Sequence, residues 1–408
     1  MRCGLLGRKL GHSYSPEIHN QLADYSYELF EKEPEELEFF LRNGDYIGLN
    51  VTIPYKKTVM QFCDKLSPIA ERLGAVNTIV RQSDGSLIGH NSDFFGFHSL
   101  LNHSGLHATS KKVLVLGSGG ASATVVAALN ELGAQTVVIS RTGENNYTNL
   151  NRHFDASIIV NTTPVGMYPN TQESPIELAQ FSKLEGVLDV IYNPAHTALL
   201  QQAEQMGIVA KNGLWMLVAQ AKESSEWFTG NQINDRVIPA IHKKLQEKMT
   251  NIVLVGMPGC GKSSVGALLA QKTGKKFIDA DKEIEGFAGR TIPEIFAATG
   301  EEGFRDIETK VLSELGKRSG CVIATGGGCV TRRKNYPLLH CNGTIIQLQR
   351  DIRKLPTAGR PLSQAGELDQ MYRVRKPLYD AFSDCIVDNN TDIDKTVQTI
   401  ISIINREA

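Results

Sequence analysis

The sequence lacks the features that mark secreted, membrane-bound and nucleic-acid-binding proteins. Its seven cysteines include no C-x-x-C pair, which argues against a zinc site or a disulfide framework and for a reducing cytosol. No segment approaches the roughly 18 apolar residues of a transmembrane helix, and the first apolar run is too short for a signal peptide. Formal net charge is −1 without a long run of either sign, so we expect no nucleic acid and no membrane as partner. These absences predict a cytoplasmic protein with small-molecule partners and leave its oligomeric state open.

The clearest motif is a glycine-rich turn in the second half of the chain. The apolar run from Ile252 to Val255 predicts a strand, and Val265 to Ala270 predicts a helix. Between them the chain matches G-x-x-x-x-G-K-[ST], the phosphate-binding P-loop, in which backbone N–H groups and a helix N-terminus face the phosphates. The alternative is a chance glycine-rich turn. The expected nucleotide-binding residues are Gly256, Gly259, Gly261, Lys262, Ser263 and Ser264.

Two carboxylates follow the P-loop. We predict a strand from Phe277 to Asp281 that ends in Asp279 and Asp281, and we interpret the pair as serving a metal or an acceptor hydroxyl. A solvated strand end is the alternative. A further buried strand, Cys321 to Thr325, leads into three glycines, and a helix is predicted to begin at Arg373.

A second glycine-rich turn lies in the first half of the chain. The apolar strand Val113 to Leu116 is followed by Gly117-Ser-Gly-Gly-Ala-Ser122, which nearly matches G-x-G-x-x-G, with Ser122 in the third glycine position. The next predicted strand, Thr136 to Ser140, ends in Arg141 and not in an acidic residue. Arginine accommodates a 2′-phosphate, so the pattern favours NADP over NAD. A solvated surface arginine is the alternative.

Polar clusters follow the predicted strands of the first hundred residues. Hydroxyls and amides at strand ends suit a polyhydroxylated ligand, because open α/β sheets bind ligands beyond the carboxyl ends of their strands. Each cluster taken alone is more often an ordinary turn or a helix cap. The clusters span residues 11–16, 50–56, 74–78 and 89–93.

Together these motifs resemble two enzyme families. Residues 1 to 248 resemble shikimate dehydrogenase, and residues 250 to 408 resemble shikimate kinase. The resemblance implies an α/β fold: a shikimate dehydrogenase-like substrate domain and a Rossmann NADP domain, followed by a P-loop domain with a parallel sheet like that of nucleoside-monophosphate kinases. The implied boundaries are 1–108 with 212–249 for the substrate domain, 109–211 for the NADP domain and 250–408 for the kinase domain.

For the dehydrogenase, the resemblance implies reduction of 3-dehydroshikimate to shikimate with NADPH. Lys56 would donate the proton, and Asp93 would orient it. The implied substrate-binding residues are Ser13, Ser15, Thr52, Asn77, Asn91, Tyr192 and Gln220. The implied NADP contacts are Gly117, Gly119, Gly120, Arg141 and Thr142, with Asn161 and Met167 beside the cofactor.

For the kinase, the resemblance implies phosphorylation of shikimate at its 3-hydroxyl with ATP and Mg²⁺. Lys262 would contact the phosphates, Ser263 and Asp279 would serve the metal, and Asp281 would receive the shikimate hydroxyls as a catalytic residue. Arg360 would be the lid arginine that closes over the transferred phosphoryl group. The implied shikimate-binding residues are Asp281, Arg305, Gly326, Gly327, Gly328 and Arg375.

Two alternatives remain open. A related enzyme pair acting on quinate would share most of the polar pocket. A ligand-sensing regulator built from decayed copies of both domains would bind without catalysis, but it would not need intact Lys56, Asp93, Lys262, Asp281 and Arg305.

Overall fold

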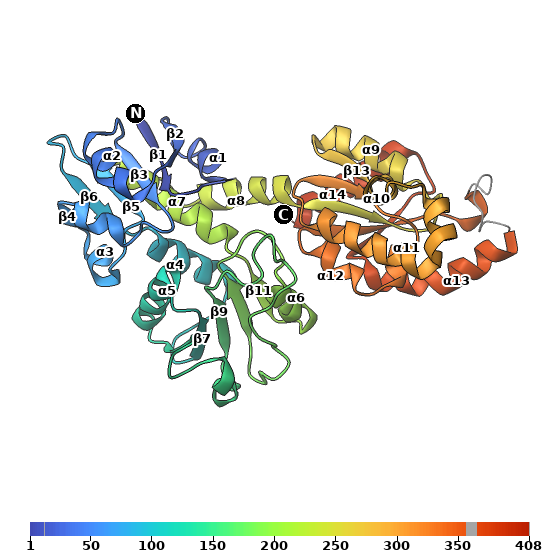
Figure 1. Ribbon diagram of the computed structural model, residues 1–408, viewed down its shortest axis with the longest axis horizontal. Helices are drawn as coiled ribbons and strands as arrows, with labels where there is room; N and C mark the ends of the chain where they lie inside the picture. Colours follow the sequence, from blue (N-terminus) through green and yellow to red (C-terminus); the bar gives the residue numbers. More distant parts are fainter. Residues whose placement is uncertain (12, 356–364, 408) are drawn as a thin grey trace. The chain divides into compact units, whose positions relative to one another are not determined.

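The computed structural model describes residues 1–11, 13–355 and 365–407, and the chain divides into two compact units (Figure 1). Both units are α/β, and parallel sheets dominate, which confirms the predicted fold class. Unit 1 comprises Met1–Val165, Ser174–Tyr192 and Gln202–Lys243, and unit 2 comprises Gly166–Glu173, Asn193–Gln201 and Lys244–Ala408.

The first sheet of unit 1 mixes parallel and antiparallel pairs in the order β2-β1-β3-β5-β6-β4. Local signals set the bounds of its helices: the Ser67 hydroxyl accepts from the Ala70 N–H where α3 begins, and Gly74 ends α3 at φ +61°. The strands are β1 (Arg2–Gly7), β2 (Ser26–Glu31), β3 (Gly48–Val51), β4 (Lys65–Leu66), β5 (Thr78–Arg81) and β6 (Leu87–His90). The helices are α1 (Ser15–His19), α2 (Leu37–Asn43) and α3 (Pro68–Leu73), with 3-10 turns η1 (Pro34–Glu36) and η2 (Thr58–Phe62).

The second sheet of unit 1 is parallel throughout, in the order β11-β10-β9-β7-β8. The run Val113–Leu116 is fully buried, as expected for a strand covered on both faces. The strands are β7 (Lys112–Leu116), β8 (Gln135–Ile139), β9 (Ile158–Asn161), β10 (Gly186–Asp189) and β11 (Val209–Lys211). The accompanying helices are α4 (Asp93–Ser104), α5 (Gly120–Glu131), α6 (Ala198–Gln205) and α7 (Leu214–Thr229), with the 3-10 turn η3 (Tyr147–His153).

The sheet of unit 2 is also parallel, in the order β13-β14-β12-β15-β16. Its central strand β12 is buried along its whole length. The strands are β12 (Asn251–Val255), β13 (Lys276–Asp279), β14 (Cys321–Ala324), β15 (Gly343–Gln349) and β16 (Cys385–Asp388). The helices are α8 (Val237–Met249), which leads into this unit, α9 (Lys262–Thr273), α10 (Ala280–Ala288), α11 (Ile292–Gly316), α12 (Asn335–His340), α13 (Ala365–Phe382) and α14 (Ile393–Glu407), with 3-10 turns η4 (Cys329–Thr331) and η5 (Ile352–Lys354).

Two predicted elements of unit 2 were wrong in their bounds. The strand predicted to reach Asp281 ends at Asp279, because the Asp279 side chain accepts from the Asp281 N–H at 3.1 Å and caps α10. Asp281 therefore lies in the first turn of a helix. The helix predicted to begin at Arg373 begins at Ala365, and it continues through Pro377.

Two short segments of the region predicted as the NADP domain group with unit 2, namely Gly166–Glu173 and Asn193–Gln201. Backbone and side-chain hydrogen bonds hold the second of them within that unit. The His196 N–H donates to the Cys341 carbonyl at 2.8 Å, and the Ala195 N–H donates to Asn342 Oδ1 at 2.8 Å.

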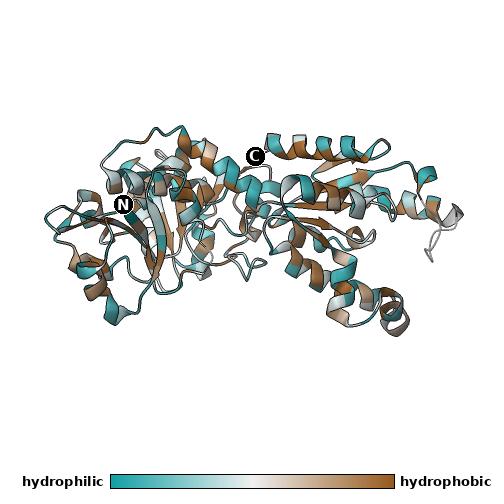
Figure 2. Cartoon of the chain, turned by 90° about the horizontal axis from the view of Figure 1, so that it is seen from above, coloured by the Kyte–Doolittle hydropathy of each residue, from teal (hydrophilic) through white to brown (hydrophobic). Residues whose placement is uncertain are grey.

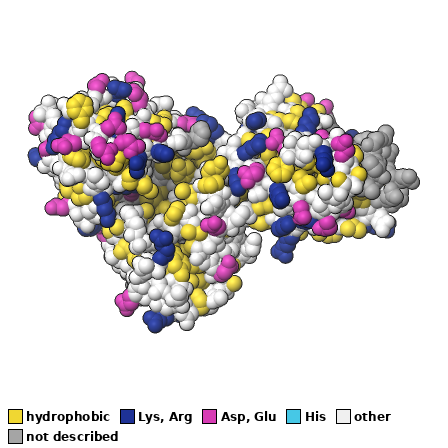
Figure 3. All heavy atoms as spheres, in the orientation of Figure 1, with side chains coloured by type: hydrophobic (Ala, Val, Ile, Leu, Met, Phe, Trp, Pro, Cys, Tyr) yellow, Lys and Arg dark blue, Asp and Glu magenta, His cyan; other side chains and the backbone are white. Residues whose placement is uncertain are grey.

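Apolar residues lie along the strands and on one face of many helices, which are therefore banded in two colours in Figure 2. On the face drawn in Figure 3, acidic and basic side chains are interspersed over each unit, in keeping with the formal net charge of −1. Within the described parts of the chain, no helix is both long enough and apolar enough to cross a membrane.

Candidate active sites

Unit 1 contains a polar cavity of about 310 Å³ beyond the ends of β1 and β3. It brings together predicted residues that are far apart in the sequence. Those that line it are Ser13, Ser15, Thr52, Lys56, Asn77, Asp93, Tyr192 and Gln220. Hydroxyls, amides and one ion pair thus converge on a space large enough for a small polar molecule.

The ion pair in this cavity joins Lys56 to Asp93. Lys56 Nζ donates to Asp93 Oδ2 at 2.6 Å, and the two side chains are 25% and 14% exposed. Lys56 follows β3 in a turn, whereas Asp93 is the first residue of α4, where the helix dipole favours a carboxylate. The pair is therefore partly desolvated but still open to the cavity, as a proton donor requires.

A buried network of hydroxyls and amides supports the amides of the cavity. The Ser224 hydroxyl lies 2.7 Å from Asn50 Nδ2, 2.9 Å from Thr78 Oγ1 and 2.8 Å from Ser92 Oγ. The Asn77 side chain accepts from the Ser92 N–H at 2.7 Å. Because buried polar groups that are satisfied have few alternative arrangements, the network fixes these amides in place.

Asn91 lies apart from the other predicted substrate residues. It is 1% exposed, donates from Nδ2 to the Ala75 carbonyl at 3.0 Å, and lines a different cavity of unit 1 of about 360 Å³. Sequence reasoning gave no role to Asn50, although this residue opens the polar cluster at 50–56 and lines the first cavity.

The fingerprint turn joins β7 to the N-terminus of α5. Gly117 has φ +106°, and a Cβ there would lie 2.9 Å from Thr162 Oγ1, so only glycine fits the close approach. At Gly119 and Gly120 a Cβ would meet open space, which leaves the helix N-terminus accessible to a phosphate. Ser122 is 3% exposed and packs where the motif has its third glycine.

The remaining predicted NADP contacts differ in their surroundings. Arg141 and Thr142 are exposed just beyond β8. Asn161 is fully buried, and its side-chain amide is hydrogen-bonded within the fold. It donates to Asp189 Oδ1 at 3.0 Å and accepts from the Thr163 N–H at 3.0 Å. Met167 is 46% exposed and belongs to unit 2.

In unit 2 the P-loop runs from β12 to α9 as predicted. Three of its glycines have positive φ: Gly256 at +144°, Gly259 at +82° and Gly261 at +101°. Lys262 is 8% exposed, and its Nζ donates to the carbonyls of Gly256 at 2.8 Å and Met257 at 3.1 Å. The ammonium thus lies against the loop, within reach of any phosphate in it.

Oxygen ligands lie beside the P-loop lysine. The Ser263 hydroxyl donates to Asp279 Oδ2 at 2.9 Å, so a hydroxyl and a carboxylate are already adjacent, as a Mg²⁺ site requires. Asp281 lies farther into the unit. Its burial, together with the nearby Asp279 carboxylate, raises the pKa of Asp281 above the ordinary value of 3.8.

Asp281 and Arg305 both lie against the glycine turn 326–328. A Cβ on Gly326 would lie 2.8 Å from Asp281 Oδ1, and one on Gly328 would lie 2.1 Å from Arg305 Nη2. Arg375 Nη1 donates to the Gly327 carbonyl at 3.3 Å. Gly326 and Gly328 are therefore required for Asp281 and Arg305 to approach the turn. Arg360 lies outside the described residues.

Glu308 holds Arg305, a role that sequence reasoning missed. Arg305 Nη1 donates to Glu308 Oε2 at 2.8 Å, and the two residues are 7% and 1% exposed. Although burial opposes the charge of Arg305, the carboxylates of Glu308 and Glu301 together outweigh it and raise the pKa of the guanidinium. Both residues follow a break in α11 at Gly300, whose φ is +68°.

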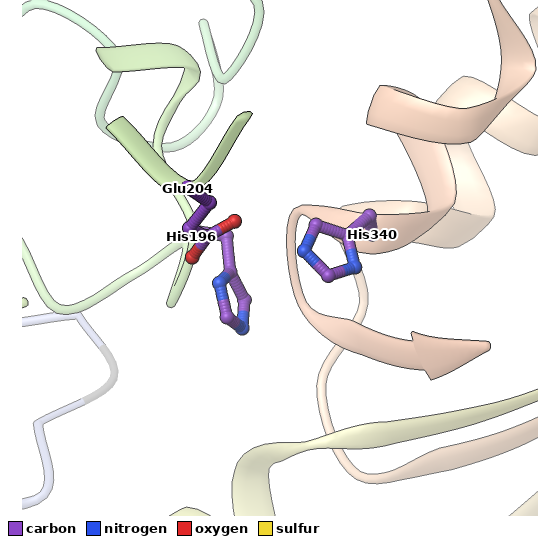
Figure 4. A group of neighbouring side chains, drawn as sticks. All are labelled: His196, Glu204 and His340. Carbon is purple, nitrogen blue, oxygen red and sulfur yellow. The ribbon is translucent and has the colours of Figure 1, made fainter. Parts of the chain in front are cut away.

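Figure 4 shows the side chains of His196, Glu204 and His340. The two imidazoles belong to unit 2, where their ring centroids are 4.6 Å apart. Glu204 belongs to unit 1, so the three residues are a site of neither unit.

Comparison with known proteins assigns both halves of the chain. The family model of the shikimate dehydrogenase substrate-binding domain matches residues 5–79, and that of shikimate kinase matches residues 258–405. The NADP(+)-dependent shikimate dehydrogenase of Caldicellulosiruptor bescii is 38% identical over 256 residues, which cover 55% of this chain and 88% of that protein. That of Clostridium beijerinckii is 33% identical and covers 59% of this chain and 96% of that protein.

Solved structures resemble the same region. A chorismate mutase/shikimate 5-dehydrogenase fusion protein from Clostridium acetobutylicum is 35% identical, with a TM-score of 0.58 over 60% of this chain and 97% of that chain. A shikimate 5-dehydrogenase from Thermus thermophilus, solved with NADP(H) and shikimate, is 30% identical, with a TM-score of 0.55 over 60% of this chain and 99% of that chain. This protein therefore belongs to the shikimate dehydrogenase family and continues into a domain of the shikimate kinase family, which makes it a bifunctional enzyme of the shikimate pathway.

Proposed function

We propose that unit 1 reduces 3-dehydroshikimate to shikimate with NADPH and that unit 2 phosphorylates the 3-hydroxyl of shikimate with ATP and Mg²⁺. The observation that carries the first reaction is the 2.6 Å pair of Lys56 and Asp93 in a polar cavity. The observation that carries the second is a P-loop in the same unit as the partly buried Asp281 and the buried Arg305.

In the reduction, Lys56 donates a proton from Nζ to the oxygen at C3 while NADPH supplies the hydride. Asp93 orients the ammonium toward the reacting oxygen and offsets its charge. Ser13, Ser15 and Thr52 bind the carboxylate and hydroxyl side of the substrate, while Asn77 and Gln220 hold the ring hydroxyls.

In the phosphorylation, Asp281 accepts the proton of the 3-hydroxyl, and its raised pKa brings it closer to a working general base. Arg305 and Arg375 hold the substrate carboxylate, because planar guanidinium groups match carboxylates. The N–H groups of the P-loop and Lys262 neutralise the phosphates. When bound, ATP supplies the phosphoryl group and Mg²⁺ its charge neutralisation. Ser263 and Asp279 would hold the metal.

One coupled assay tests both steps. Purified protein is given 3-dehydroshikimate, NADPH, ATP and Mg²⁺, and NADPH oxidation and ADP release are followed together. We expect both, with ADP release dependent on prior reduction or on added shikimate. Failure of either signal rejects the corresponding half. Quinate with NAD or NADP is the control substrate, because one similar structure is a quinate dehydrogenase from Corynebacterium glutamicum at 25% identity and a TM-score of 0.55.

A further inference from the structure

Asn389 touches the P-loop from a distant part of the chain. It lies just after β16, is 6% exposed, and donates from Nδ2 to the Cys260 carbonyl at 2.6 Å. Its backbone N–H donates to the Gln349 carbonyl at 2.7 Å, which ties it to the end of β15. Asn389 is therefore anchored to the sheet and bonded to the residue before Gly261.

Thr396 sets the orientation of the Asn389 amide. The Thr396 hydroxyl, from α14, donates to Asn389 Oδ1 at 2.8 Å, and Thr396 is 1% exposed. With Oδ1 accepting from this hydroxyl, the amide must present Nδ2 to Cys260. A flipped amide would place two oxygens together at the P-loop and lose the hydrogen bond to Cys260.

The direction of one carbonyl fixes the direction of the next N–H. The peptide between Cys260 and Gly261 is planar and trans, so its C=O and N–H point opposite ways. Because the Cys260 carbonyl points toward Asn389, the Gly261 N–H points away from Asn389. Gly261 is the residue that precedes α9. Gly261 has φ +101°, and a Cβ there would lie 2.8 Å from Asn389 Nδ2, so glycine is needed for this contact. Glycine would also let the peptide rotate if the contact were lost.

We propose that Asn389 is a positioning residue for the kinase: it holds the Cys260 carbonyl so that the Gly261 N–H faces the nucleotide phosphates. The proposal rests on the kinase half of the proposed function. Asn389 itself contacts the loop and acts on the phosphates through it. A donor that is aligned before the nucleotide arrives needs no reorganisation when charge develops in transfer.

The test uses the full chain and five variants. Asn389→Asp keeps the shape but replaces the donor with an acceptor, Asn389→Ala removes the side chain, and Thr396→Val removes the hydroxyl that orients the amide. Thr396→Ser keeps that hydroxyl. Thr399→Val is the matched control, because the exposed Thr399 hydroxyl donates to the Lys395 carbonyl of its own helix, at 2.9 Å.

We expect Asn389→Asp to lower kcat/KM for ATP by about 10- to 100-fold. This is less than the roughly 10²–10³-fold loss seen when an aligned donor is removed outright, because the Gly261 N–H remains and only its support is lost. Asn389→Ala should cause a smaller loss. Thr396→Val should cause a loss of about 3- to 10-fold, because without the hydroxyl the Asn389 amide can adopt both the original and the flipped orientation. Thr396→Ser and Thr399→Val should stay within about twofold of the parent. Affinity for shikimate, measured by calorimetry, should be retained in every variant, which shows that unit 2 is folded.

Three results would overturn the proposal. These are an Asn389→Asp variant within twofold of the parent, equal effects of Thr396→Val and Thr399→Val, and parallel loss of shikimate binding and ATP kinetics. If the parent itself transfers no phosphate to shikimate, the proposed kinase function fails. The dissociation constant of Mg-ADP, compared across the same variants, then still decides whether Asn389 orders the loop.

Discussion

Lys56 and Asp93 form a 2.6 Å ion pair although 37 positions separate them in the chain. If Lys56 is the proton donor, Lys56→Ala should lower the rate of 3-dehydroshikimate reduction by about two to four orders of magnitude, the usual reach of a general acid. Phosphorylation of added shikimate should persist, because the kinase residues lie in the other unit. Reduction at nearly the parental rate would show that the proton comes from elsewhere.

Arg141→Ala tests the basis of cofactor preference. Arg141 is exposed just beyond β8, where a 2′-phosphate would be bound, and a charge-assisted hydrogen bond of this kind contributes about 1.5–3 kcal/mol. The Michaelis constant for NADPH should therefore rise about tenfold or more, while that for NADH should change little. Equal changes for both cofactors would remove Arg141 from the role.

Asp281→Asn should nearly abolish phosphate transfer, by about 10²- to 10⁴-fold, while the dissociation constant of Mg-ADP stays within a fewfold of the parent. The P-loop residues bind the nucleotide independently of this carboxylate. Loss of nucleotide affinity as large as the loss of rate would instead place Asp281 at the metal.

The raised pKa of Asp281 gives a separate prediction on pH. Only the carboxylate accepts a proton, so kinase kcat/KM should fall as pH drops through this pKa, with its midpoint above the ordinary value of 3.8. The same shift means that the folded state binds the proton of Asp281 more tightly than the unfolded chain does. Protonation of Asp281 therefore stabilises the fold at low pH, and this stabilisation is lost as pH rises through the folded pKa. Asp281→Asn stays neutral, and at pH 7 it should raise the unfolding temperature of unit 2. A decrease would contradict the burial argument.

Separate expression of residues 1–249 and 250–408 should give two folded proteins, each with its own activity, because each is large enough to bury a core. The cut removes Asn193–Gln201 from unit 2, including two hydrogen bonds made by Ala195 and His196. At about 1 kcal/mol each, their loss should lower the unfolding temperature of the kinase piece by several degrees. An insoluble or inactive piece would show that the predicted boundary at 249/250 does not separate independent domains.

The motifs that the sequence itself determined are contiguous. The P-loop and the turn at Gly117 can be read from the printed chain because a few adjacent residues create both the backbone shape and the helix N-terminus. Asp281 was predicted from its place after a strand near the P-loop, whereas Lys56, Asp93 and Arg305 were assigned roles only through the family resemblance. Only the fold brings Lys56 and Asp93 into one cavity and sets Asp281 and Arg305 against one glycine turn.

Other relationships were decided by tertiary structure alone. Asn389 reaches Cys260 across 129 positions, and Asn50 reaches Ser224 across 174, and no local pattern encodes either contact. Glu308 had a signal in its spacing from Arg305, but only its near-complete burial shows that it must hold that charge. Likewise, Asp281 was predicted to end a strand but lies in α10, because Asp279 caps that helix. Sequence periodicity fixes which elements form, whereas hydrogen-bond partners depend on which strand ends the sheet order brings together.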